Sequence, residues 1–231
     1  MSSYEFNIHQ LEAVAAGLED LLPMVTFLGG CTTALLVDES AHFGVRQTKD
    51  VDVIIDVTTY VGYQSFSKKL REKGFVEDVD GPNCRWLFRS ELATIQLDVM
   101  PIDEDALGFA NRWYPDAIKN SFQHKLDSGI QIAVASPVYF LATKFEAFDG
   151  RGEGDYFSHD IEDIVFVLEN SSDIINKILA SPLTLKEYLA ERMGNLLNDR
   201  FLNVLPGILN SHESVRAVEN ILRIISGKPW R

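Results

Sequence analysis

The stretch KDVDVIIDVTT, residues 49–59, sets aspartate beside valine and then continues into apolar residues. Valine and isoleucine favour extended backbone, so VDVIIDV at residues 51–57 predicts a buried strand. Side chains two residues apart on a strand point to the same face of the sheet, which places Asp50 and Asp52 together. The stretch therefore predicts a strand that carries two carboxylates where it begins.

These two aspartates have the chemistry and the spacing of a metal site. On one face of a strand their β-carbons lie roughly 6–7 Å apart, and carboxylate oxygens are ligands that Mg²⁺ prefers, so the pair predicts two Mg²⁺ ions. Asp98 is the one acid inside the apolar segment IQLDVMP, and a neighbouring strand would add it as a third ligand. The alternative is that Asp50 and Asp98 end their strands or pair with Arg85.

A glycine pair, LGG at residues 28–30, precedes this strand, and the segment that follows it, residues 31–40, predicts a helix. Glycines let backbone N–H groups approach an anion, and the start of a helix offers free donors and the positive end of its dipole. Thr32 and Thr33 add hydroxyl groups at the same place. Together with the aspartates, this turn predicts a cradle for a triphosphate beside a metal site.

The remaining segments predict an α/β half followed by a helical half. A helix is expected at residues 7–22, ended by Pro23, and a second at 60–73. Extended segments at 24–30, 84–90, 93–102 and 130–135 predict further strands, the middle two forming a hairpin across a polar turn. From Ser136 onward only helices are expected. We therefore expect an α/β core at residues 1–135 and a helical region at 136–231 that completes the active site.

The composition indicates an ordinary globular protein of 231 residues with a net charge of −13. No apolar run approaches the roughly 20 residues of a membrane span, and the acidic, amphipathic N-terminus is unlike a signal peptide, so we expect a cytoplasmic protein without a membrane partner. Cys31 and Cys84 are expected as reduced thiols and not as nucleophiles. A negative surface disfavours nucleic acid except at a local basic patch, and the densest basic segment is SKKLREK at residues 67–73, which is also typical of a solvated helix face.

A family resemblance rests on three segments, LGGCTTALL, VRQTKDVDVII and QLDVMP. They resemble the nucleotidyltransferase fold of the DNA polymerase β type, and within it the AbiEii toxin-like branch, which has an Arg-x-Thr before the aspartates and later a lysine-bearing and an aspartate-bearing helix. Here ATKFEAF and HDIEDI correspond to those two helices. The resemblance covers about residues 24–168. It implies an α+β fold, a mixed β-sheet with flanking helices followed by a helical C-terminal half.

The resemblance also implies roles for individual residues. Asp50 and Asp52 would bind Mg²⁺ and Asp98 would complete the site. The implied nucleotide-binding residues are Gly29, Gly30, Thr32, Thr33, Arg46, Thr48 and Lys144.

Lys144 is implied to offset charge on the leaving pyrophosphate, and Asp160 or Asp163 to act as general base or metal ligand. The residues themselves leave alternatives open. Lys144 could extend its ammonium to solvent from a packed helix, and the two acids could simply favour the positive end of a helix dipole.

Three functions follow as hypotheses. In the first, the chain uses Mg²⁺ to transfer a nucleoside monophosphate from an NTP to a tRNA acceptor, as the toxin that is paired with an antitoxin protein. In the second, the acceptor hydroxyl belongs to a cationic small molecule such as an aminoglycoside, which the acidic surface favours. In the third, the chain is a nucleotide-binding interaction module without catalysis.

Overall fold

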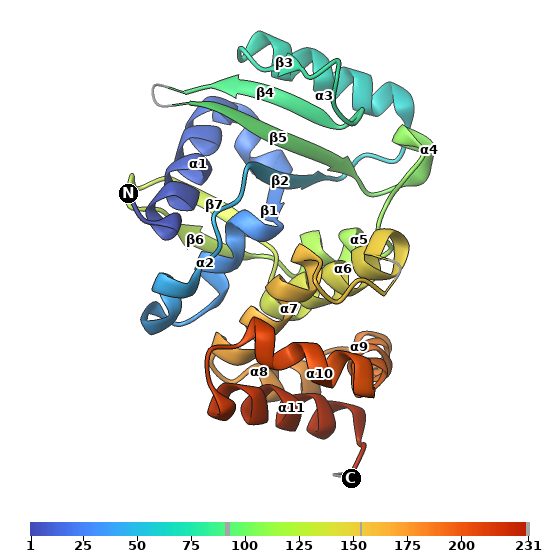
Figure 1. Cartoon of the computed structure of the whole chain (residues 1–231). Helices are drawn as coiled ribbons and strands as arrows, with labels where there is room; N and C mark the ends of the chain where they lie inside the picture. The colour runs from blue at the N-terminus through green and yellow to red at the C-terminus, as the bar shows by residue number, and fades with distance from the viewer. Residues whose placement is uncertain (91–92, 153, 230–231) are drawn as a thin grey trace. The chain divides into compact units, whose positions relative to one another are not determined.

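The computed structural model describes residues 1–90, 93–152 and 154–229 (Figure 1). These residues form two compact units, 1–136 and 137–231, whose internal structures are considered separately. The first contains all the strands found in the described residues, and the second is helical. None of the helices in these ranges is both long enough and apolar enough to cross a membrane.

The first unit is built on one seven-stranded mixed sheet with the order β3-β4-β5-β2-β1-β7-β6. β2 pairs in parallel with β5, and β1 in parallel with β7, whereas the other neighbours are antiparallel. The strands are β1 (Val25–Leu28), β2 (Asp50–Ile55), β3 (Val76–Glu77), β4 (Arg85–Arg89), β5 (Thr94–Pro101), β6 (Phe122–Lys125) and β7 (Gln131–Val134).

The predicted hairpin is confirmed as β4 and β5, while its polar turn at residues 91–92 lies outside the described residues. Strands β3 and β6 were not expected. β3 is two exposed residues long, and β6 has the sequence FQHK, whose polar alternation lacks the β-branched residues by which a strand is recognised.

The two faces of the central strands differ in polarity. Alternate residues of β2 and β5 are fully buried, including Val51, Val53, Leu97 and Val99. Helices α1 (Ser3–Leu18) and α3 (Tyr60–Glu72) flank the sheet (Figure 1). The Tyr63 hydroxyl of α3 donates to the carbonyl of Val99, and Gly17 of α1 lies against the ring of Phe88 on β4. The opposite face of the same strands therefore carries Asp50, Asp52 and Asp98.

The segment after the glycine pair differs from the predicted helix at residues 31–40. A 3₁₀ turn at Gly30–Thr32 leads into α2 (Thr33–Leu36), a single turn of α-helix, and after Asp38 the chain continues as a 3₁₀ helix at Glu39–Gly44. The apolar residues Ala34 and Leu36 are buried, but Val37 and Asp38 are extended, which ends the helix. α1 likewise ends at Leu18, and a 3₁₀ helix at Glu19–Met24 contains Pro23. Two further short helices are α4 (Glu104–Leu107) and α5 (Tyr114–Lys119).

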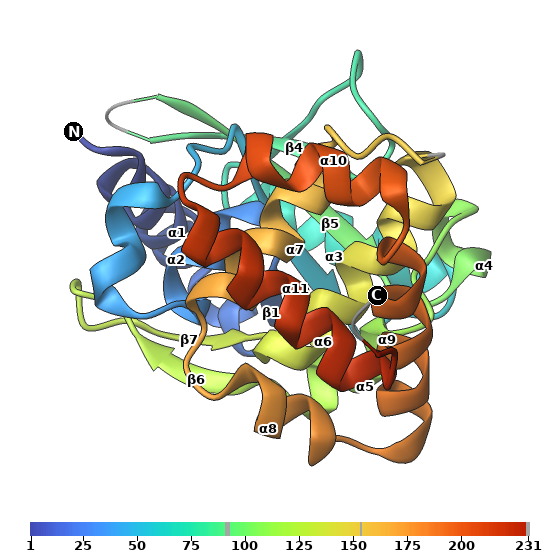
Figure 2. The same ribbon diagram turned by 60° about the horizontal axis from the view of Figure 1, so that its bottom comes forward.

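The second unit consists of six α-helices and a π-helical turn among its described residues. The helices are α6 (Pro137–Ala147), α7 (His159–Asn170), α8 (Ile174–Leu179), α9 (Leu183–Leu196), α10 (Asp199–Ile208) and α11 (His212–Ser226), with the π turn at Phe148–Gly152. α6 packs on α7, and α11 runs along α9 and also contacts α7 (Figure 2). The expectation of helices alone after Ser136 is therefore confirmed for the described residues.

Candidate functional site

One row of side chains crosses the sheet at the level of Asp52. Leu28 of β1 is paired with Asp52 of β2, Asp52 with Asp98 of β5, and Asp98 with Arg85 of β4. Paired residues on adjacent strands point to the same face, so the three polar side chains of this row share one face with Asp50, two residues along β2. The expectation that a neighbouring strand brings Asp98 beside the aspartate pair is met.

Arg85 binds two of these carboxylates. Its Nε donates to Asp98 Oδ1 and its Nη2 to Asp98 Oδ2, both at 2.7 Å, a bidentate geometry. Nη2 also lies 3.4 Å from Asp50 Oδ2. The Asp98 and Arg85 side chains are only 12% and 19% exposed, and the hydrogen bonds to Asp98 raise the pKa of the guanidinium, which stays charged. The pairing with Arg85 that the sequence left open as an alternative therefore exists.

Gly29 brings the glycine turn against Asp52. Because Leu28 pairs with Asp52, the next residue, Gly29, begins the turn directly beside the carboxylate. Its φ of +76° lies in the left-handed region, and a β-carbon added to it would overlap the Asp52 carboxylate. Both the backbone conformation and the available space therefore require glycine at this position.

The two threonines of the turn are satisfied locally. Thr32 Oγ1 donates to the carbonyl of Gly29 at 2.9 Å, and Thr33 Oγ1 to the carbonyl of Gly30 at 2.7 Å. Both side chains are buried. Their hydroxyls therefore close the glycine turn in this structure, and the α-helix that follows is a single turn, shorter than the one on which the predicted anion cradle was based.

Arg46 and Thr48 belong to the segment that leads into β2, and two residues of α1 hold that segment. Asn7 donates to the carbonyl of Arg46 at 2.8 Å and accepts from the Thr48 N–H at 3.1 Å, and Gln10 donates to the carbonyl of Thr48 at 3.1 Å. Asn7 is completely buried and Gln10 almost so. Neither Asn7 nor Gln10 was predicted as a site residue from the sequence. The available signal was their spacing of three, which sets two amides on the apolar side of a helix.

Lys144, Asp160 and Asp163 form one cluster inside the helical unit. The Lys144 ammonium lies 3.1 Å from Asp160 Oδ1 and 2.8 Å from Asp163 Oδ2. The lysine side chain is 12% exposed and each acid 5%, so the alternative in which Lys144 extends to solvent is wrong. The sequence left open whether Asp160 or Asp163 is the general base or metal ligand, and in the structure both carboxylates bind the Lys144 ammonium.

The donors of the first unit fit a hard divalent cation through Asp50 and Asp52. Both offer carboxylate oxygens on one face, and the missing β-carbon of Gly29 leaves the space in which the Asp52 carboxylate lies. Asp98 differs, because both its oxygens accept from Arg85. Within the described ranges no three Asp, Glu, His or Cys side chains are grouped as a metal-ligand set. Asp50 and Asp52 are thus placed for a metal, with one oxygen of Asp50 also 3.4 Å from Arg85, and Asp98 is held by the arginine through both its oxygens.

Neither cysteine of this unit is suited to nucleophilic chemistry. Cys31 and Cys84 are both buried free thiols. Burial raises the pKa of Cys84 to about 12, and burial also raises the pKa of Cys31. Both thiols therefore stay protonated at neutral pH.

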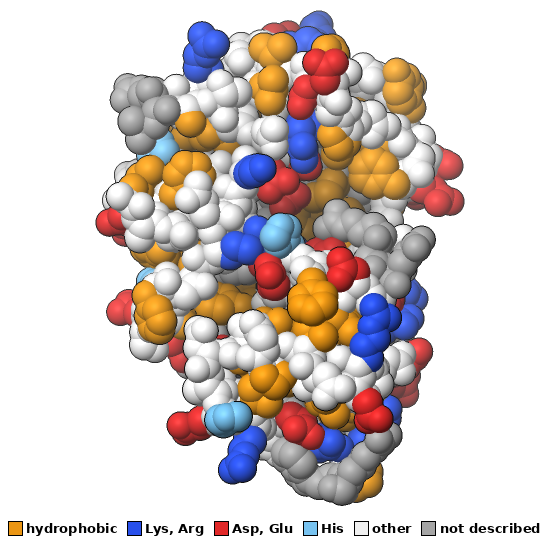
Figure 3. Space-filling view, viewed as in Figure 1, with side chains coloured by type: hydrophobic (Ala, Val, Ile, Leu, Met, Phe, Trp, Pro, Cys, Tyr) orange, Lys and Arg blue, Asp and Glu red, His pale blue; other side chains and the backbone are white. Residues whose placement is uncertain are grey.

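Two of the four basic side chains in the segment at residues 67–73, at the end of α3, are paired with acids. Arg71 pairs with Glu77, and Lys73 lies 2.6 Å from both Glu19 and Asp20. The neighbouring strand residue Trp86 is fully buried and belongs to the core. On the face shown in Figure 3, Lys and Arg side chains are dispersed among Asp and Glu. These ion pairs therefore reduce the positive charge that this segment could offer to RNA.

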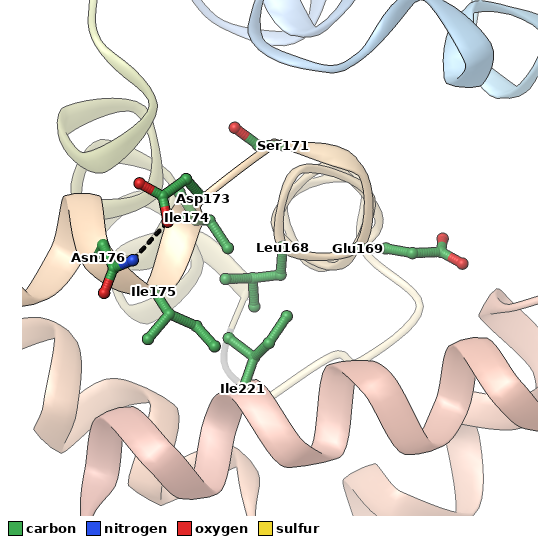
Figure 4. A pocket seen from close by; sticks show the side chains of 8 residues that line it. All are labelled: Leu168, Glu169, Ser171, Asp173, Ile174, Ile175, Asn176 and Ile221. Carbon is green, nitrogen blue, oxygen red and sulfur yellow. Dashed lines mark hydrogen bonds between the residues drawn. The ribbon is translucent and has the colours of Figure 1, made fainter.

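A cavity of about 410 Å³ lies within the helical unit, between the end of α7, the start of α8 and α11. The side chains of Leu168, Ile175 and Ile221 converge on it, and Asn176 donates to Asp173 at its edge at 2.6 Å (Figure 4). No lysine or arginine lines it. The cavity therefore lacks the cations that would recognise a triphosphate, and it contains none of the predicted site residues.

The carboxylates of Asp50, Asp52 and Asp98, which share one face, are called the carboxylate row. The mixed sheet, the glycine turn against Asp52 and this carboxylate row belong to a nucleotidyltransferase-like α+β fold, which confirms the predicted fold class. The crystal structure of an antigenic nucleotidyltransferase-like protein from Paracoccidioides brasiliensis is similar, with a TM-score of 0.54 and 18% sequence identity over 92% of this chain and 93% of that one. No family model and no curated protein sequence matches the chain. The likeness thus concerns the fold.

Proposed function

We propose that this chain is a nucleotidyltransferase, which transfers a nucleoside monophosphate from an NTP to an acceptor hydroxyl and releases pyrophosphate. The observation that carries the proposal is the contact between Gly29 and the Asp52 carboxylate. A glycine turn beside a carboxylate of a central strand is where a triphosphate and its cation would meet. The AbiEii-like branch remains part of the proposal through the sequence resemblance alone.

In this function Asp50 and Asp52 would hold Mg²⁺, which when bound stabilises charge on the phosphates and lowers the pKa of a hydroxyl. The Gly29–Thr32 turn would receive the β- and γ-phosphates, with its shape fixed by the two threonine hydroxyls. Asn7 and Gln10 keep β2 in place against α1 by holding the segment before it. By resemblance, the Lys144 cluster would supply a cation to the pyrophosphate and a base.

For the acceptor, the structure favours a cationic small molecule over tRNA. The chain has a net charge of −13, and the basic residues Arg71 and Lys73 are committed to acidic neighbours. Anionic RNA would meet long-range repulsion, whereas an aminoglycoside-like molecule would be attracted. A tRNA-modifying toxin with an antitoxin partner remains the second candidate because the sequence resembles the AbiEii-like branch.

The test is transfer of label from each α-labelled NTP, with Mg²⁺, to total tRNA and to an aminoglycoside in parallel. We expect label on the aminoglycoside and release of pyrophosphate. Label on tRNA alone would favour the toxin, and growth arrest relieved by a neighbouring gene would support that outcome. NTP binding without pyrophosphate release in either mixture would contradict transfer and favour the interaction module.

Replacement of Gly29 by alanine should abolish most of this activity. The added methyl group overlaps the Asp52 carboxylate and displaces it, and misplacing a reacting group by about 1 Å costs on the order of 100-fold in rate. The positive φ adds a backbone cost of about 1 kcal/mol. Transfer rate and urea unfolding of Gly29→Ala measure the two effects separately.

Gly74→Ala is the matched control. Gly74 has φ +85°, and nothing lies within 4 Å of a β-carbon built on it. This variant should lose about the same 1 kcal/mol of stability yet transfer at the unmodified rate. Equal losses of activity in the two variants would show that the contact with Asp52 is not what the reaction requires.

A further inference from the structure

The guanidinium of Arg85 places a positive charge directly beside the carboxylate row. Arg85 is the Cα partner of Asp98, it binds both Asp98 oxygens, and the same nitrogen reaches Asp50. Neither Asp98 nor Arg85 is well solvated, at 12% and 19% side-chain exposure, so water screens this interaction weakly. A bidentate guanidinium–carboxylate pair in such a place resists displacement.

We propose that Arg85 takes the place of one metal ion, so that the site binds a single divalent cation through Asp50 and Asp52 while Asp98 is withheld from it. This inference rests on the proposed function. It replaces the expectation of two Mg²⁺ ions that the sequence alone supported. Arg85 is thereby a positioning residue, which acts on the cation site through Asp98 and Asp50.

The formal charges of the row agree with one cation. Asp50, Asp52 and Asp98 with Arg85 leave two negative charges, which one divalent ion neutralises. Without Arg85 three negative charges would gather on one face, and Asp98 would offer two unoccupied oxygens. The row would then provide a third carboxylate ligand, as a larger metal centre needs.

Binding of Mn²⁺ to the nucleotide-free full chain, followed by the EPR signal of the free ion, tests this directly. The unmodified chain should bind one Mn²⁺. Arg85→Gln should bind Mn²⁺ about tenfold more tightly, because the Asp98 carboxylate is no longer bound by the guanidinium and becomes a further ligand for the metal. Arg89→Gln removes the same charge from an exposed position on the same strand face and should change the affinity by less than about twofold.

A double-mutant cycle distinguishes two causes of tighter binding. One is release of the Asp98 carboxylate from Arg85, and the other is the loss of a positive charge near the cation site. In the Asp98→Asn background, Arg85→Gln should change Mn²⁺ affinity by less than about twofold, because the Asp98 carboxylate is already gone and only the longer contact of 3.4 Å with Asp50 is released. Equal gains in both backgrounds would overturn the proposal, as would two Mn²⁺ ions bound by the unmodified chain. The variant Arg85→Gln/Asp98→Asn contains no unpaired buried charge at the pair. If Arg85→Gln alone fails to fold, this double variant should still bind one Mn²⁺ through Asp50 and Asp52, and loss of that ion would overturn the proposal.

The Mn²⁺ readout is independent of nucleotidyl transfer. If the cycle shows the expected coupling but the unmodified chain transfers no label to any acceptor, the role of Arg85 stands and the proposed function fails. If transfer occurs but the unmodified chain binds two ions, the function stands and the inference about Arg85 is wrong.

Discussion

Asp52→Asn is expected to reduce nucleotidyl transfer by on the order of 1,000-fold, since a metal-held transition state is stabilised by several kcal/mol and each 1.36 kcal/mol is a factor of ten. Asparagine keeps the shape of the side chain against Gly29 but removes its charge. The fold should therefore persist, with an unfolding midpoint close to that of the unmodified chain. Initial rates at saturating NTP and Mg²⁺ measure the effect, with Mn²⁺ binding followed in parallel.

Asp56→Asn is the control for this change. Asp56 directly follows β2, is exposed, and carries the same carboxylate a few residues away from the site. Its replacement should leave both the transfer rate and Mn²⁺ binding essentially unchanged. If Asp52→Asn retained full activity and full metal affinity, the carboxylate pair at the start of β2 would not be the cation site, and the proposal would lose its central residue.

The central sheet could be predicted from the sequence because its signals are local. Apolar residues on either side of Asp52 predict the strand, and period-two alternation then fixes which side chains share a face. The same logic predicted that Asp98 lies on a neighbouring strand. The length of the helix after the glycine pair was not predictable in this way, because it ends where Val37 and Asp38 become extended and no Gly or Pro marks that point.

The sequence did not determine which charged side chains pair with one another. Arg85 and Asp98 are thirteen residues apart, and only the register of β4 against β5 makes them neighbours. Asn7 lies about forty residues before the segment it holds, so its function appears only once α1 is packed. Periodicity places a residue on a face, but long-range hydrogen bonds depend on tertiary packing.

Lys144→Met should destabilise the chain by about 3 kcal/mol, because it removes the ammonium that lies 3.1 Å from Asp160 and 2.8 Å from Asp163, two buried carboxylates. The methionine preserves most of the side-chain volume but removes the ammonium, including its position 5.8 Å from the centre of the Phe140 ring, so the loss reports on charge. Urea unfolding measures it. Lys177→Met, at an exposed position on α8, removes the same charge and should change stability by less than about 0.5 kcal/mol.

The triple variant Lys144→Met/Asp160→Asn/Asp163→Asn distinguishes a structural cluster from a functional one. It removes the two buried carboxylate charges together with the lysine, so most of the lost stability should return. Transfer should not return, because the proposed cation for the pyrophosphate and both candidate bases are gone. A triple variant that folds and transfers at the unmodified rate would confine these three residues to stabilising the helical unit, and the roles implied by the resemblance would be withdrawn.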